Sequence, residues 1–279
     1  MKKSLFLLGL AAALFSAGAR AAEPPFDAKE VARKAEERYI GDDLSTALQM
    51  QLIDASGKTR RREFLIYRRT YPEGKKTLYK FLYPEDIKDT ATLNEEVKGA
   101  QDIQHLFLPA ARKLRRISTK NQSWMGSDFI YEDLEEINLD DYRYEAIGFE
   151  TLDGYNCYVY AMVPLSDDRS AYGKQIRWIR RNGHLPVKIE YYDKQGQLLK
   201  VARMTDLREE AGAIYAWDIE MKNVRDSHRT VIRRRWIFLN TGIPDDLLTT
   251  RALQKPIEFY NHPAKMWETW KNALAKDGS

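Results

Sequence analysis

The amino-acid sequence predicts a mainly β protein built around one large antiparallel sheet. Apolar and polar residues alternate in many short segments, of which Leu44 to Leu52 is the clearest. Turn residues such as Asn182-Gly183 separate these segments at short intervals. Short strands joined by tight turns are typical of antiparallel hairpins, so we expect the sheet to curl into a barrel or to fold into a sandwich.

About a dozen short strands are expected from this alternation. In chain order they are Leu44–Leu52, Arg61–Arg68, Lys76–Tyr83, Thr90–Val97, Asp102–Leu108, Lys113–Ser118, Tyr142–Phe149, Tyr155–Val163, Lys174–Arg180, Val187–Tyr192, Gln197–Asp206, Ile214–Met221 and Thr230–Phe238.

Helical patterns are confined to the ends of the chain and to one internal gap. Apolar residues at helical spacing predict helices over Asp27–Tyr39, Asp245–Leu253 and Pro263–Lys276. The longest stretch without a strand pattern is Thr119–Asp141, in which Ile130–Ile137 has room for one or two helical turns.

The first 21 residues have the pattern of a secretory signal peptide. Lys2 and Lys3 precede an apolar run from Leu5 to Phe15, which is too short to anchor the chain in a bilayer. Ala19-Arg20-Ala21 supplies the small residues of a cleavage site, so we expect cleavage after Ala21.

The part that follows the signal is expected to form a single domain, residues 22–279. No repeat or low-complexity linker divides it, and residues 240–279 form its C-terminal helical tail. The signal contains three of the 45 basic residues and no acidic one, so the formal net charge falls from +4 to +1. This near balance disfavours a nucleic-acid partner.

Cys157 is the only cysteine in the sequence. An exported chain with one cysteine forms no internal disulfide and no cysteine-based zinc site. It also lacks a cysteine at the expected cleavage site, where a lipoprotein carries its lipid anchor. We therefore expect a soluble, monomeric protein of the periplasm.

Residues suited to catalysis are sparse. The four histidines, at positions 105, 184, 228 and 262, lie neither at zinc-ligand spacing nor beside a nucleophile motif, so bland surface or strand roles are expected. Acidic pairs such as Asp42-Asp43 and Asp140-Asp141 fall at the ends of elements, where caps and solvated turns are usual. We expect no catalytic residue, no metal and no cofactor, which disfavours a periplasmic hydrolase.

Clustered arginines leave two interpretations open. Arg60–Arg62 and Arg233–Arg235 lie on or beside strands. Alternation places Arg234 on the same face as Ile232 and Trp236, as an inward or rim charge that could meet a lipid phosphate or an acidic partner. The other interpretation is a solvated face whose charges discourage pairing between sheet edges.

Aromatic residues make up 11% of the chain, and many of them fall on the expected strands. They suit either a filled core or the wall of an apolar cavity, because a large curled sheet leaves room for one ligand. The residues expected to line such a cavity are Phe64, Ile66, Phe81, Trp178, Ile189, Trp217 and Trp236.

Three motifs carry a resemblance to a known family. They are Phe81-Leu82-Tyr83-Pro84-Glu85-Asp86-Ile87-Lys88-Asp89-Thr90-Ala91, then His105-Leu106-Phe107-Leu108-Pro109-Ala110 with basic residues over 112–116, then Met125-Gly126-Ser127-Asp128-Phe129. In this order they resemble the exported outer membrane lipoprotein-sorting proteins, and the resemblance covers roughly residues 44–238.

The resemblance implies the LolA/LolB-like fold, an unclosed and strongly curved antiparallel β-barrel of about eleven strands with a helical lid. It implies a periplasmic carrier that holds the acyl chains of a lipid or lipoprotein and shuttles them towards the outer membrane. An inner-membrane exporter and an outer-membrane acceptor would be its partners. The alternative is an envelope stress sensor, or an accessory protein of a membrane lipid exporter, on the same fold.

The lid is assigned to Trp124, Met125, Gly126 and Phe129. This segment interrupts the strand pattern, yet it is apolar where a simple exposed loop would be polar. Methionine and aromatic side chains suit a surface that meets varied acyl chains, and Gly126 favours movement. A static plug packed on the sheet is the other reading of the same residues.

The signal-peptide assignment predicts a mature protein that begins at Ala22 and is released with the soluble periplasmic fraction. The short apolar run and the absence of an anchoring cysteine are the reasons. N-terminal sequencing and fractionation measure both properties. A mature form that stays in the membrane after high-salt washing would contradict the assignment.

Overall fold

The computed structural model describes residues 25–97, 102–118 and 121–260, and these form one antiparallel sheet of thirteen strands. The strands are β1 (Asp43–Ile53), β2 (Thr59–Tyr71), β3 (Gly74–Tyr83), β4 (Ala91–Val97), β5 (Ile103–Leu108), β6 (Lys113–Arg116), β7 (Tyr142–Leu152), β8 (Tyr155–Pro164), β9 (Lys174–Arg180), β10 (Pro186–Tyr192), β11 (Leu198–Glu210), β12 (Ala213–Asn223) and β13 (His228–Leu239). Each overlaps a strand expected from the alternation, whereas the eleven strands implied by the resemblance are two too few.

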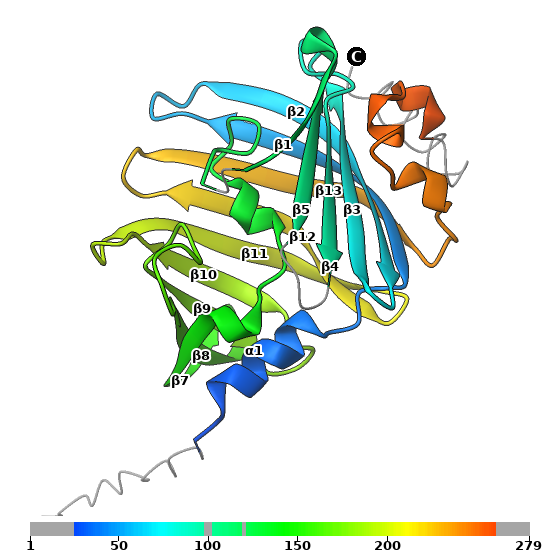
Figure 1. Cartoon of the computed structure of the whole chain (residues 1–279). Helices are drawn as coiled ribbons and strands as arrows, with labels where there is room; N and C mark the ends of the chain where they lie inside the picture. The colour runs from blue at the N-terminus through cyan, green and yellow to red at the C-terminus, as the bar shows by residue number, and fades with distance from the viewer. Residues whose placement is uncertain (1–24, 98–101, 119–120, 261–279) are drawn as a thin grey trace, which may run out of the picture.

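The sheet is an unclosed, curved surface made of two wings (Figure 1). Its strand order is β6-β5-β4-β3-β2-β1-β13-β12-β11-β10-β9-β8-β7, so each wing is a meander of hairpins. The two wings join where β1 pairs with β13 in the middle of the sheet. The edges are β6 and β7, which are neighbours in the sequence but lie at opposite ends of the sheet.

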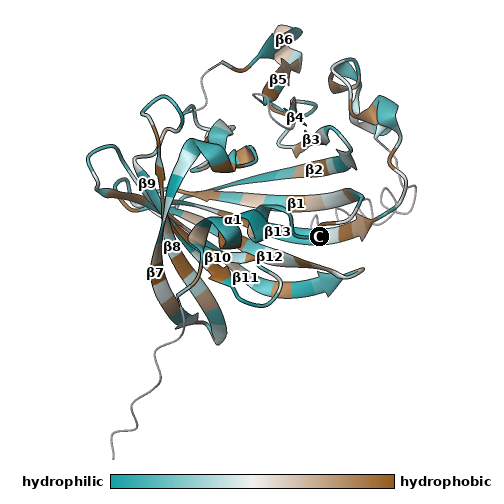
Figure 2. Ribbon diagram, turned by 60° about the horizontal axis from the view of Figure 1, so that its bottom comes forward, coloured by the Kyte–Doolittle hydropathy of each residue, from teal (hydrophilic) through white to brown (hydrophobic). Residues whose placement is uncertain are grey.

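Alternation along each strand divides the sheet into two faces, seen as bands of contrasting hydropathy in Figure 2. On β2, Phe64 and Ile66 point to the concave face, while Leu65 and Tyr67 point to the convex face. Both faces are covered by other parts of the chain, so apolar residues occupy both sides of these strands.

The only α-helix among the described residues, α1 (Ala28–Glu36), lies on the concave side of β8 and β9. Asp27 caps it by accepting hydrogen bonds from the N–H groups of Lys29 and Glu30. Its buried face packs against Tyr160 and Ile179. The helix is shorter than the expected Asp27–Tyr39 and ends at Glu36.

The convex face of the first wing is covered by the segment that follows β13. This segment forms the 3₁₀ turns η4 (Asp245–Leu247), η5 (Ala252–Gln254) and η6 (Ile257–Phe259), drawn in orange in Figure 1, in place of the helix expected over Asp245–Leu253. Its Tyr260 carbonyl accepts a 2.5 Å hydrogen bond from Tyr67. The helix expected over Pro263–Lys276 and the signal segment lie outside the described residues.

Three further 3₁₀ turns are η1 (Pro109–Ala111), η2 (Tyr131–Leu134) and η3 (Leu139–Asp141). Within the described ranges, no helix is long and apolar enough to cross a membrane.

Gly74, at the tight turn between β2 and β3, lies too close to β4 to carry a side chain. A Cβ atom there would lie 1.8 Å from the Glu96 carbonyl oxygen of β4, and the φ angle is +154°. Gly74→Ala is therefore expected to lower the melting temperature strongly, because two backbones would have to separate.

Gly57→Ala is the matched control, since Gly57 has a φ of +84° but open space where the Cβ atom would lie. Its melting temperature is expected to fall less, through backbone strain alone. Equal melting temperatures for the two variants would show that β4 does not approach Gly74 this closely.

Candidate functional site

The segment from Ile117 to Asp141 joins the two edge strands and crosses the concave face of the sheet (Figure 1, green). We call it the crossing segment. It contains η2, η3 and an isolated bridge between Ser123 and Ile130. It occupies the place of the expected helical lid, but its helical content is limited to 3₁₀ turns.

Trp124 fixes the crossing segment to the first wing. Its side chain is 1% exposed, and its ring lies 5.3–5.4 Å from the rings of Phe64, Tyr79 and Phe81. The contacts with Phe64 and Tyr79 are edge-to-face, a favourable arrangement for aromatic pairs. In this structure Trp124 therefore packs as a plug over β2 and β3.

The Gly126-Ser127-Asp128-Phe129 motif binds the crossing segment to the middle of the sheet. The Ser127 hydroxyl closes a tight turn by donating to the Trp124 carbonyl (2.7 Å). The Asp128 carboxylate accepts a 2.7 Å hydrogen bond from Thr230 on β13, and His228 Nδ1 lies 2.9 Å from it. The sequence predicted only a surface or strand role for His228, because a partner 100 residues away leaves no local signal.

Asp133 fixes the crossing segment to the second wing. Lys200 on β11 donates 2.7 Å to the Asp133 carboxylate and 3.0 Å to the Asp128 carbonyl, and both side chains of the ion pair are 4% exposed. The Tyr172 hydroxyl also donates to Asp133. Burial and the nearby Asp133 charge raise the pKa of Tyr172 well above its ordinary value, which keeps this hydroxyl a donor.

A deep cavity of about 570 Å³ lies under the crossing segment on the second wing. Its cover includes Phe129, and its walls include Tyr172 and Tyr191, whose ring centroids are 4.7 Å apart. Its floor is formed by aliphatic and methionine side chains of β10, β11 and β12, namely Ile189, Ala202, Met204, Ile219 and Met221. The volume is in the usual range for small-molecule sites.

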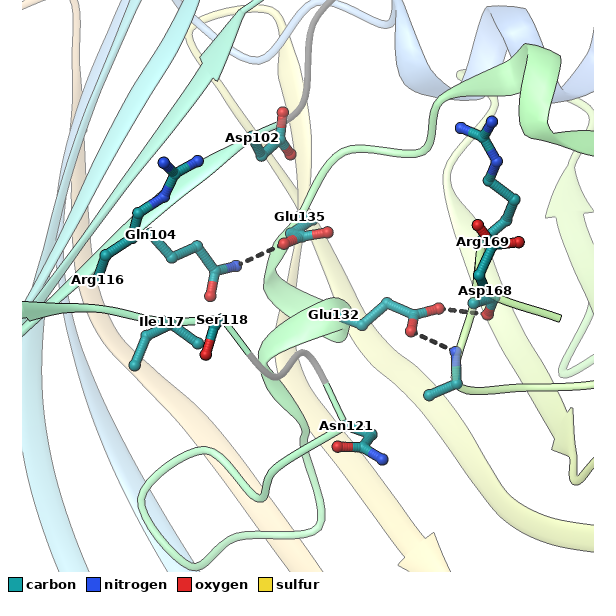
Figure 3. A pocket seen from close by; sticks show the side chains of 12 residues that line it. Asp102, Gln104, Arg116, Ile117, Ser118, Asn121, Glu132, Glu135, Asp168 and Arg169 are labelled. Carbon is teal, nitrogen blue, oxygen red and sulfur yellow. Dashed lines mark hydrogen bonds between the residues drawn. The ribbon is translucent and has the colours of Figure 1, made fainter.

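A second, more open cavity of about 620 Å³ adjoins the first (Figure 3), and polar side chains predominate in the lining of both cavities. Both cavities flank η2 and share Asp102, Glu132, Glu135, Asp168 and Arg169. Glu132 holds the wall in place by accepting hydrogen bonds from the Ser170 hydroxyl and the Ala171 N–H group.

The seven residues expected to line a cavity divide between the two faces. Five point to the concave face: Phe64, Ile66, Phe81, Ile189 and Trp217. Only Ile189 belongs to the lining of the deep cavity, whereas Phe64 and Phe81 are covered by Trp124.

Trp178 and Trp236 require a correction, since both lie on the convex face. Trp178 packs with Cys157 and Val187, and Trp236 packs with residues of the segment after β13. Alternation distinguishes two faces but does not say which one is concave. A bulge between Ala47 and Leu48 also shifts the register against β13.

Arg234 takes the inward rather than the rim position. It donates to Thr46 Oγ1 (2.7 Å) on the concave face, and its guanidinium lies 5.2 Å from the Tyr215 ring centroid. Burial, with Arg68 nearby, lowers the pKa of Arg234 to about 10. The concave face is therefore charged in places.

Glu96 on β4 is a second buried charge on the concave face. Burial raises its pKa to about 7, and Lys75 opposes this shift. Lys75 also pairs with Glu136 of the crossing segment, so β3 contributes an ionic contact to the cover.

Groups suited to metal or nucleophilic chemistry do not gather at this site. No group of three or more His, Cys, Asp or Glu side chains in the described ranges is arranged to hold a metal ion. Cys157 is buried on the convex face, where burial raises its pKa and disfavours the reactive thiolate.

Comparison with known proteins finds one family model and several solved structures that are similar to this chain. A family model described as an uncharacterized protein family matches residues 73–255. A crystal structure of a domain named for outer membrane lipoprotein sorting, from Vibrio parahaemolyticus, is 27% identical. It has a TM-score of 0.77, and the match covers 82% of this chain and 98% of that chain.

Two further crystal structures are similar. A DUF1329 family protein from Desulfovibrio piger is 26% identical with a TM-score of 0.76, covering 81% of this chain and 98% of that chain. The LolA superfamily protein NE2245 from Nitrosomonas europaea has a TM-score of 0.64 at 18% identity, covering 82% of this chain and 100% of that chain. No curated protein matches the chain in sequence.

The packing of Trp124 predicts how the crossing segment responds to mutation. Trp124→Ser is expected to lower the free energy of unfolding by about 3–5 kcal/mol, the usual cost of truncating a buried aromatic side chain. Phe129→Ser should lower the free energy of unfolding by less, because Phe129 is only half-buried. Denaturant unfolding measures both.

Met125→Ser is the control, because Met125 is a half-buried neighbour of Trp124 in the same turn. If Trp124→Ser unfolds like the wild type but binds a fluorescent fatty-acid probe more weakly, Trp124 belongs to a mobile lid and does not act as a plug.

Proposed function

Because the chain belongs to the outer membrane lipoprotein-sorting family of the DUF1329 type, we propose that it is a periplasmic carrier of acyl chains. It takes up a lipid or the lipid part of a lipoprotein at the inner membrane and shuttles it towards the outer membrane. An inner-membrane exporter and an outer-membrane acceptor are the partners that this function requires. The protein works as a monomer and catalyses no reaction.

The observation that carries this proposal is the deep cavity between the second wing and the crossing segment. Its floor is apolar, and its cover includes Phe129 of the crossing segment. Phe129 packs against both the Trp124 cluster and the cavity cluster, so a shift of the crossing segment would enlarge the deep cavity.

The free energy of transferring an acyl chain from a bilayer to the protein is expected to be small. Each buried methylene is worth about 0.8 kcal/mol against water, so a sixteen-carbon chain gains roughly 12 kcal/mol on leaving water. Against a bilayer the gain is close to zero, because the chain is already in an apolar medium. Direction must then come from the pump, from the acceptor, or from the contacts that hold the crossing segment closed.

Native mass spectrometry of protein released gently from the periplasm tests the proposal. We expect a mass above that of the polypeptide, which organic extraction removes and whose fragments identify an acylated molecule. Extracted protein should then bind a fluorescent fatty-acid probe. A polypeptide that carries no lipid and binds no probe would contradict the carrier function.

A further inference from the structure

We propose, resting on the carrier function above, that Arg38, Arg68 and Arg234 form a phosphate-binding site on the concave face, which holds the head group of the cargo. We call these three residues the arginine cluster. A phosphorylated lipid and free phosphate share the chemistry that this site recognises, and the experiment below distinguishes them.

The arginine cluster is assembled from three distant parts of the chain. Arg38 lies between α1 and β1, Arg68 lies on β2, and Arg234 lies on β13. Tyr215 on β12 connects the last two, because Arg68 Nη2 lies 3.0 Å from its hydroxyl oxygen and the Arg234 guanidinium lies 5.2 Å from its ring centroid. Arg68 also donates to the carbonyl of Ile40 (3.3 Å), two residues beyond Arg38.

No carboxylate neutralises these three side chains. Among the described residues, none of them forms an ion pair, and the hydrogen bonds of Arg68 and Arg234 go only to hydroxyl and carbonyl oxygens. Within the same ranges Arg38 donates no hydrogen bond, and its Nη1 atom is enclosed without a partner. All three side chains are half-buried, so each keeps some contact with solvent.

The carboxylates that face this region are engaged with other cations. Glu36, at the end of α1, lies 3.5 Å from Arg177 Nη1. Burial raises the pKa of Glu96 to about 7 against the opposing charge of Lys75, so Glu96 carries only part of its charge at neutral pH. Lys75 also pairs with Glu136. The arginine cluster therefore keeps an excess of positive charge after these ion pairs are counted.

The arginines destabilise one another's charged forms, and an anion would relieve this. Burial lowers the pKa of Arg38 and of Arg234, and the charge of Arg68 adds to both shifts. Charges that are partly removed from water interact more strongly than exposed ones. Guanidinium groups match the geometry of phosphate oxygens and bind them with paired hydrogen bonds, so phosphate is the anion that this cluster fits best.

The apolar floor of the deep cavity begins on the same strand as the cluster. Tyr215, Trp217 and Ile219 alternate along the concave side of β12, and Ile219 belongs to the lining of the deep cavity. A strand rises about 3.3 Å per residue, so Tyr215 and Ile219 are separated by roughly 13 Å, a distance that a long acyl chain bridges. A phospholipid placed along β12 therefore has its phosphate at the arginine cluster and its tail on the floor.

Isothermal titration with decyl phosphate, uncharged decyl glucoside and inorganic phosphate tests the proposal, with both decyl compounds below their micelle concentrations. Decyl phosphate is expected to bind about tenfold tighter than decyl glucoside, an effect of roughly 1.4 kcal/mol, and also tighter than inorganic phosphate. The preference for decyl phosphate should shrink as sodium chloride is added.

Arg38→Gln removes one charge from the cluster without breaking a hydrogen bond between described residues. It is expected to reduce the preference for decyl phosphate at least threefold and to leave decyl glucoside binding unchanged. Its melting temperature in phosphate-free buffer should equal or exceed that of the wild type, because repulsion with Arg68 is relieved.

Arg233→Gln is the matched control. It removes the same charge from the neighbour of Arg234 on β13, an exposed side chain that points to the opposite face of the sheet and lies 3.6 Å from Asp218. Its affinities for the three compounds should equal those of the wild type.

The outcomes separate the two proposals. If the two decyl compounds bind equally, or if Arg38→Gln keeps the full preference, the phosphate assignment is wrong while the carrier function stands. If inorganic phosphate binds as tightly as decyl phosphate, the site belongs to free phosphate and the head-group assignment is overturned. If neither decyl compound binds, the carrier function itself fails.

Discussion

The pairing of β1 with β13 is the constraint on which the rest of the structure depends. Within each wing, every strand pairs with strands that are adjacent to it in the sequence. In contrast, β1 and β13 pair although most of the chain separates them in the sequence. Because the first and last strands meet in the middle, the edges of the sheet are strands from the middle of the sequence. The chain must therefore cross one face of the sheet to pass from β6 to β7, and it crosses the concave face.

This crossing places one segment in contact with both wings and explains the sequence motif at its centre. Ser127 closes the turn that buries Trp124 against the first wing, while Asp128 and Asp133 accept hydrogen bonds from β13 and β11. A buried ion pair such as Lys200–Asp133 adds little net stability but is costly to break on one side. It therefore specifies where the segment lies more than it stabilises the fold.

The concave face combines apolar and acidic side chains. Aliphatic side chains of the second wing form the floor of the deep cavity, whereas η2 and the adjoining loop contribute carboxylates to its lining. The first wing contributes buried polar side chains, such as Asn94 and Gln104, in place of a continuous apolar wall.

The sequence by itself determined the strands, since alternation and turn residues are local properties, and all thirteen expected ranges overlap observed strands. It also indicated that residues 119–141 interrupt the sheet, because they lack the alternation of a strand. Only the tertiary structure decided that Trp178 and Trp236 lie on the convex face and that His228 and Lys200 hold Asp128 and Asp133 in place. Which face is concave, and which distant residues meet there, depend on the pairing of β1 with β13, a long-range contact that no local pattern encodes.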